Sequence, residues 1–157
     1  MDAEVYPNPR VEGFLTQHFV PVKVHIREQP QTFDRFGVQW TPVLVVFDAQ
    51  GREQYRWEGF LPTDDFIGQL AMGRAHLAFA KRDWKEAAAR FDEVARRHAD
   101  AEFGPAAVYW AGVARYKDGD ESALPATARA LRERYPGSAW TTKASVWEPA
   151  EQEGARA

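Results

Sequence analysis

The stretch GVQWTPVLVVFDAQGREQYRWEGF, residues 37–60, predicts two strands joined by a tight turn. Residues 43–47 are apolar on both faces, which is typical of a central strand that is covered on two sides. The segment DAQG that follows places Gly51 where a turn needs a left-handed backbone. Residues 52–59 alternate between a charged face and a face with aromatic side chains, which indicates a strand nearer an edge. Pro42 precedes the first strand, where its missing N–H needs no acceptor.

Outward from this stretch, the chain predicts further alternating elements. Asn8 is a favourable N-cap and Pro9 a favourable first residue for a helix. Residues 20–26 alternate apolar and polar side chains and predict a half-buried strand. A short helix is expected to end at Gly37, and residues 62–70 start another helix. The predicted order is helix, strand, helix, strand, strand, helix.

Composition excludes several classes of function. The 157 residues carry 20 basic and 23 acidic side chains, so the chain lacks the basic excess that phosphate-backbone binding requires, and we expect no nucleic-acid partner. No apolar run approaches the roughly 20 residues of a membrane helix, and the N-terminus lacks the pattern of a secretory signal. The chain contains no cysteine, so disulfides, thiolate metal sites and thiol catalysis are excluded for these residues. A cysteine-free chain fits a reducing compartment, and we expect a cytoplasmic protein without a membrane association or a cofactor.

The second half of the chain is helical in pattern and repeats itself. A shift of 37 residues aligns Phe79 with Tyr116 and Val94 with Leu131, so a helix, a polar turn and a second helix occur twice. The pair resembles degenerate tetratricopeptide repeats, with a small residue in the middle of the first helix and Ala-x-x-x-Phe in the second. A last helix is expected over residues 138–147, with its aromatic side chains facing inward.

The first half resembles a thioredoxin-fold protein that lacks its beginning. The resemblance covers about residues 1–70, and its most specific part is Thr41–Pro42 followed by an apolar strand. It implies a cis peptide bond at Pro42, and a loop of Trp40, Thr41 and Pro42 that offers backbone groups to an extended substrate peptide. Without the resemblance, the same residues describe a tight turn that leads into a core strand.

The resemblance also implies parts that this chain lacks. In the family a Cys-x-x-Cys motif and the strand before it would lie ahead of Met1. Either Met1 is an internal methionine of a longer native chain, or a deletion has left a fold without redox chemistry. By the family's topology the missing strand would lie between the strands at 20–26 and 43–47. We therefore expect altered packing or dimerisation, because unpaired strand edges cost stability.

The expected fold class is α/β, with an incomplete thioredoxin-like sheet flanked by helices, followed by an all-α region of tetratricopeptide-like helical hairpins. The expected boundaries are 1–69 for the thioredoxin-like domain, 70–147 for the helical region and 148–157 for a polar tail.

Other candidate sites in the sequence are weak. The four histidines have no close paired spacing, so we expect no zinc or other metal site. The acidic segment KDGDE, residues 117–121, lacks the spacing of a calcium loop and predicts a turn between two helices. No nucleophile with an accompanying base and no glycine-rich phosphate loop occurs, so no catalytic residue is predicted.

Three functions remain as hypotheses. The first is a binding or chaperone-like module for a protein or peptide client, with Trp40, Thr41 and Pro42 as substrate-binding residues. The second is a thiol–disulfide oxidoreductase whose Cys-x-x-Cys lies upstream of residue 1. The third is a structural or assembly element that uses its helical repeats. A homodimer is compatible with each.

Overall fold

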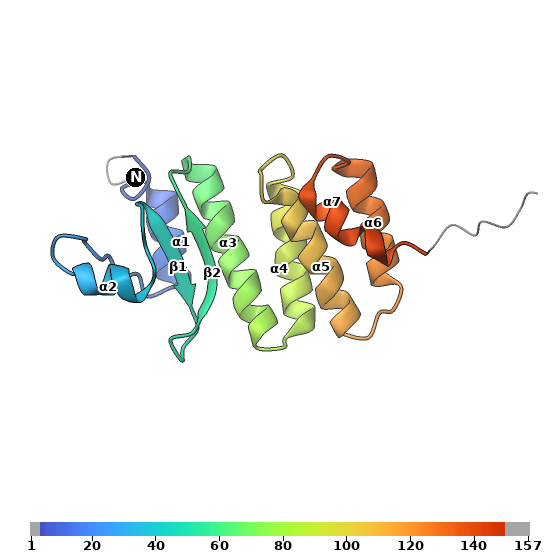
Figure 1. Cartoon of the computed structure of the whole chain (residues 1–157), viewed down its shortest axis with the longest axis horizontal. Coiled ribbons are helices and arrows are strands. Elements are labelled where there is room, and N and C mark those ends of the chain that lie inside the picture. The colour runs from blue at the N-terminus through green and yellow to red at the C-terminus, as the bar shows by residue number, and fades with distance from the viewer. Residues whose placement is uncertain (1–3, 150–157) are drawn as a thin grey trace, which may run out of the picture. The chain divides into compact units, whose positions relative to one another are not determined.

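The computed structural model describes residues 4–149, which fall into two compact units that divide between Gly73 and Arg74 (Figure 1). The first unit contains α1 (Pro9–His18), α2 (Pro30–Arg35), β1 (Val43–Phe47), β2 (Glu53–Glu58) and the start of α3 (Thr63–Ala80). The second contains the end of α3, followed by α4 (Trp84–Arg97), α5 (Gly104–Lys117), α6 (Ala123–Arg134), α7 (Ala139–Ala144) and the 3₁₀ turn η1 (Ser145–Trp147). Among the described residues, no helix is both long enough and apolar enough to cross a membrane.

Local sequence signals explain most element boundaries in the first unit. The Asn8 side chain accepts a hydrogen bond from the Arg10 N–H, and Pro9 opens α1, as predicted. The short helix α2 is followed by Gly37, which adopts its φ of +63° without the steric cost that a side chain would add. Gly51 has a φ of +75° in the turn between β1 and β2, which confirms the predicted turn.

The two strands form an antiparallel hairpin. Val43 lies opposite Glu58 and Val46 opposite Tyr55, and a β-bulge follows Val46. One face of the hairpin packs on α3, since the Trp57 ring lies 5.7 Å from the ring of Phe66. Figure 1 shows α2 on the opposite side of the hairpin from α3. The buried side chains of this unit come from the N-terminal segment, α1, the hairpin and α3: Val5, Val11, Val46, Trp57, Phe66, Leu70 and Met72.

Two sequence predictions about the sheet are wrong. Residues 20–26 form no strand, and Val20 and Val22 are 91% and 80% exposed. β1 is not a central strand, because within residues 4–149 the sheet consists of β1 and β2 alone. Alternating side chains make a strand only where a neighbouring strand takes up the backbone N–H and C=O groups. Residues 20–26 and β1 are also not paired with each other.

The second unit is a series of packed helices. α4 presents a face of buried side chains, Ala87, Phe91 and Val94 among them, as its apolar spacing predicts. Each helix packs on the next along the chain, and α7 with η1 closes the series against α5 and α6 (Figure 1). Ala144 is fully buried there, with Trp140 and Trp147 packed beside it, so the predicted inward face of the last helix is confirmed.

The small residues of the repeat pattern allow these helices to approach closely. Ala75 in α3 and Gly112 in α5, which align at the shift of 37, are both buried. A Cβ atom placed on Gly112 would lie 2.1 Å from Oγ1 of Thr127 in α6, so only glycine fits at this contact. Of the predicted polar tail, Glu148 forms an ion pair with Arg132, and residues 150–157 lie outside the described part of the chain.

Candidate functional site

Trp40, Thr41 and Pro42 lie at one end of the hairpin, directly before β1. The Thr41–Pro42 peptide bond is cis, as the family resemblance implies. The Pro42 carbonyl accepts a hydrogen bond of 2.8 Å from the Gly59 N–H, which ties this loop to the end of β2. The Trp40 side chain is 78% exposed, and Thr41 is also exposed. The loop is therefore fixed by its backbone and presents a large aromatic ring to solvent.

The outer edge of β1 has unpaired backbone groups. Since Pro42 and Gly59 form a hydrogen-bonded pair, the antiparallel alternation makes Val43 and Val45 members of non-hydrogen-bonded pairs. Their N–H and C=O groups point away from β2, and no partner for them occurs among residues 4–149. β1 contains neither lysine nor proline, the residues that commonly protect an edge from pairing with another chain.

Exposed apolar side chains gather in the same unit. Eight large apolar side chains are exposed in the described part of the chain, and six of them fall between residues 20 and 60: Val20, Val22, Ile26, Trp40, Phe47 and Phe60. Only exposed apolar side chains that lie together in space mark an interaction surface, since single exposed apolar residues are common on any protein.

Sequence reasoning missed Phe60 as a candidate. The antiparallel register that pairs Pro42 with Gly59 continues to Thr41 and Phe60, so Phe60 lies at the same end of the hairpin as Trp40. Its side chain is 54% exposed. The available signal was its position directly after Gly59, whose φ of +90° ends the strand, but a lone phenylalanine in a sequence is more often buried.

Buried contacts hold the other face of the hairpin in place. The Tyr55 hydroxyl donates a hydrogen bond to Oε1 of Gln69 in α3, and burial raises the pKa of this hydroxyl, which keeps its proton at neutral pH. Gly73 in α3 leaves room for Val46, since a Cβ there would lie 2.8 Å from Cγ2 of that valine. The exposed end of the hairpin is thus supported by a packed side.

The β1–β2 turn is fixed by Asp48. Its carboxylate accepts hydrogen bonds from the backbone N–H groups of Gln50 and Arg52 and pairs with the Arg52 guanidinium at 2.8 Å. The backbone hydrogen bond from Arg52 is the main cause that lowers the pKa of Asp48. This carboxylate has a structural role in the turn.

In the second unit, the histidine and acidic side chains that the sequence offers as candidate sites have structural contacts. Within residues 4–149, no group of three or more histidine, aspartate and glutamate side chains is placed to hold a metal ion. The histidines of the second unit are packed: His98 lies 5.7 Å from the Phe103 ring, and His76 lies between Phe91 and Trp110. Burial lowers the pKa of His76 to about 4. In the KDGDE segment, Asp120 accepts hydrogen bonds from Ser122, which makes this segment a turn, as predicted.

Comparison with known proteins bears on the first unit. Residues 1–73 match the family model of a thioredoxin-like domain. No curated protein and no solved structure matches the chain. The match, together with the hairpin and its flanking helices, confirms the expected fold class of a partial thioredoxin-like sheet followed by a helical region. The helices beyond residue 73 lie outside the matched segment.

Proposed function

We propose that the protein is a binding module for extended segments of other proteins, and that the first unit holds such a segment at the outer edge of β1. The observation that carries this proposal is the unpaired edge of β1 next to a loop with an exposed Trp40. Strand addition would give the peptide hydrogen bonds to the backbone groups of Val43 and Val45.

The exposed aromatic side chains would supply specificity. Backbone pairing is largely independent of peptide sequence, so selection depends on the alternate side chains that the peptide presents. Trp40 and Phe60, at the end of the hairpin, offer apolar contact to such side chains. Tryptophan in particular contributes strongly to binding energy where it becomes buried at an interface. The preferred ligand is therefore an extended peptide with alternating apolar side chains.

The helical unit supports a chaperone-like role for the whole chain. Its sequence, repeated at a shift of 37, resembles tetratricopeptide repeats, and stacked helical hairpins form extended surfaces for partner proteins. Several aromatic side chains lie only partly buried along it, including Tyr109, Trp110 and Trp140. A client could then be held by the first unit while the helical unit engages a partner.

Fluorescence anisotropy with a labelled heptapeptide of alternating valine and threonine, flanked by lysines, tests this proposal. Two N-methylated versions of the peptide, each blocking every second amide, separate strand addition from simple apolar adhesion. One set of amides faces β1 and the other faces away, so one version should lose binding and the other should keep it. Equal binding of both versions would overturn the proposal.

Trp40→Ala localises the binding. We expect this variant to weaken the affinity for the peptide about tenfold, because a large aromatic anchor is removed. Tyr116→Ala is the matched control, since Tyr116 is also an exposed aromatic residue, 45% accessible, but lies in the helical unit. An unchanged affinity for Trp40→Ala would remove Trp40 from the site.

Thiol–disulfide exchange is a second candidate function, and the match of residues 1–73 to a thioredoxin-like domain favours it. This chain contains no cysteine, so reactive thiols would have to come from residues outside it. Mass spectrometry of the N-terminal peptide of the endogenous protein is the test. An in-frame Cys-x-x-Cys ahead of residue 1 would support the redox function, and its absence would exclude it.

A further inference from the structure

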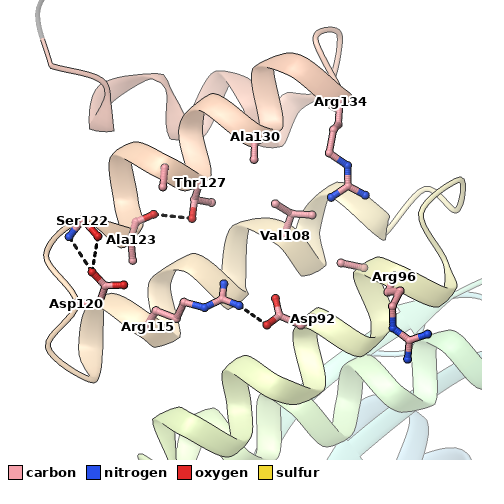
Figure 2. A pocket seen from close by; sticks show the side chains of 12 residues that line it. Asp92, Arg96, Val108, Arg115, Asp120, Ser122, Ala123, Thr127, Ala130 and Arg134 are labelled. Atoms are coloured by element: carbon pink, nitrogen blue, oxygen red, sulfur yellow. Dashed lines mark hydrogen bonds and ion pairs between the residues drawn. The ribbon is translucent and has the colours of Figure 1, made fainter.

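A groove runs along the helical unit between α4 and α6, with α5 at its base (Figure 2). Its volume is about 610 Å³. Small apolar side chains contribute much of its floor and walls, among them Ala95, Val108, Ala123 and Ala130. Because these side chains are short, a polypeptide lying in the groove could bring its own side chains close to the helix backbones.

The charges around the groove are unevenly satisfied. Asp92 forms an ion pair with Arg115, and Asp120 is occupied by hydrogen bonds from Ser122 (Figure 2). Arg96 and Arg134 also line the groove, and among residues 4–149 neither forms an ion pair with a carboxylate. The guanidinium of Arg134 lies 5.3 Å from the Tyr135 ring, a contact that leaves its charge uncompensated.

The two arginines lie at the same end of the groove. Figure 2 shows Arg96 and Arg134 at one end, and Asp120 with Ser122 at the other. The side chains at the arginine end come from α4 and α6, so the two guanidinium groups flank the groove from opposite walls. A ligand with carboxylates at this end would pair with both, and a charge-assisted pair of arginine with a carboxylate is stronger than a neutral hydrogen bond.

We propose that this groove binds a short acidic segment of a partner protein, with the carboxylates of that segment on Arg96 and Arg134 and its apolar side chains against the small apolar side chains of the groove. The span of α6 from Ala123 to Arg134 is about 16 Å, which about five extended residues would cover. A free anion would leave most of the apolar floor uncovered. Charge complementarity therefore selects an acidic polypeptide that also carries apolar side chains.

Anisotropy with a rhodamine-labelled hexapeptide of alternating leucine and glutamate tests the proposal. The reference peptide has glutamine in place of glutamate and is otherwise identical. We expect the acidic peptide to bind at least about tenfold more tightly than the reference, and this advantage to shrink as salt is added. Equal affinities for the two peptides would overturn the proposal.

Charge reversal at the arginines localises the site. The double variant Arg96→Glu/Arg134→Glu should abolish the preference for the acidic peptide. Arg129→Glu is the matched control, because Arg129 is an exposed arginine on the same helix, α6, and does not line the groove. If Arg129→Glu loses the preference for the acidic peptide to the same extent, the effect comes from net charge alone, and this result would count against the groove as the site.

Two further measurements complete the test. Circular dichroism melting of each variant establishes that the helices remain folded, and Ala126→Phe, on an exposed position that lines the groove, should block the peptide sterically without any change of charge. Binding that survives Ala126→Phe would place the acidic peptide elsewhere. Trp40→Ala should leave this binding unchanged, so failure here and failure of the strand-addition site are distinguishable.

Discussion

The two units satisfy their backbone hydrogen bonds in different ways. In the helical unit, the hydrogen bonds of α4, α5 and α6 close within each helix, and each helix packs on its neighbour in the sequence. In the first unit, β1 depends on a neighbouring strand for every backbone hydrogen bond, and β2 supplies only one side. A helical hairpin satisfies its backbone hydrogen bonds by itself, whereas a strand needs partner strands from elsewhere in the chain or from another chain.

This difference explains where exposed apolar side chains occur. The helical unit has two large exposed apolar residues among those described, Tyr116 and Val146, and its other large apolar side chains are at least partly covered. The first unit has six. The same difference predicts that deletion of a buried side chain lowers the free energy of unfolding more in the helical unit. The residues around the resulting cavity are held on both sides there and cannot move to close it.

Deletion of one buried phenylalanine in each unit compares them directly. Phe91 and Phe66 are both fully buried. Phe91→Ala should lower the free energy of unfolding by about 3–5 kcal/mol, and Phe66→Ala by less, since the open-edged unit can relax into the space. Urea unfolding followed by circular dichroism gives the two values, and hydrogen exchange shows which helices lose protection. A larger loss for Phe66→Ala would reverse the comparison.

Acid sensitivity should be stronger in the helical unit because of His76. Its ring lies 5.0 Å from Phe91 and 5.3 Å from Trp110, and burial lowers its pKa to about 4 from 6.5. The unfolded chain therefore binds a proton that the folded chain rejects between these two pKa values, so stability is fully present above about pH 6.5 and falls as the pH drops toward 4. The shift corresponds to about 3 kcal/mol of stability.

A variant isolates this contribution from that of the other titrating groups. His76→Leu should unfold in urea with a shallower dependence on pH than the wild type between about pH 6.5 and pH 4. His25→Gln is the control, because it removes an exposed histidine of the first unit and leaves His76 in place. Identical slopes for His76→Leu and the wild type would show that His76 does not carry the effect.

Local signals predicted the elements that need no partner from elsewhere in the chain, and failed where a strand depends on one. Asn8 with Pro9, Gly51, and the spacing of Ala87, Phe91 and Val94 each act within one element, and the structure confirms all of them. The alternation at residues 20–26 is an equally good local signal, but within the described residues, 4–149, no strand pairs with it, and the predicted strand is not formed.

The candidate sites divide in the same way. The loop of Trp40 to Pro42 could be found because the family resemblance marks it. The exposure of Phe60 and the uncompensated charges of Arg96 and Arg134 depend on which residues the fold brings near them. Neither property has a signature in a single sequence.

Overpacking at Gly112 tests how tightly α5 and α6 approach. A Cβ at this position would meet Thr127, whose hydroxyl is buried and donates a hydrogen bond of 2.7 Å to the Ala123 carbonyl. Gly112→Ala should therefore destabilise the helical unit by about 1–3 kcal/mol, although alanine is the better helix former. Thermal unfolding measures the loss. If the double variant Gly112→Ala/Thr127→Ala, which removes the Oγ1 and Cγ2 atoms that a Cβ on residue 112 would meet, recovers none of it, the clash with the threonine side chain is not its cause.

Gly13→Ala makes the same substitution in a helix of the first unit and should have the opposite sign. Gly13 lies within α1, no atom is found within 4 Å of a Cβ placed on it, and its φ is an ordinary helical one. The added methyl group meets no neighbour, so only the helix preference of alanine acts, and it should stabilise the unit by about 0.5–1 kcal/mol. Hydrogen exchange of the α1 amides measures this small gain more directly than global unfolding does. Slower exchange would show that α1 accommodates the added methyl group, whereas α5 does not. Faster exchange would mean that the methyl group destabilises α1, and the contrast between Gly13 and Gly112 would fail.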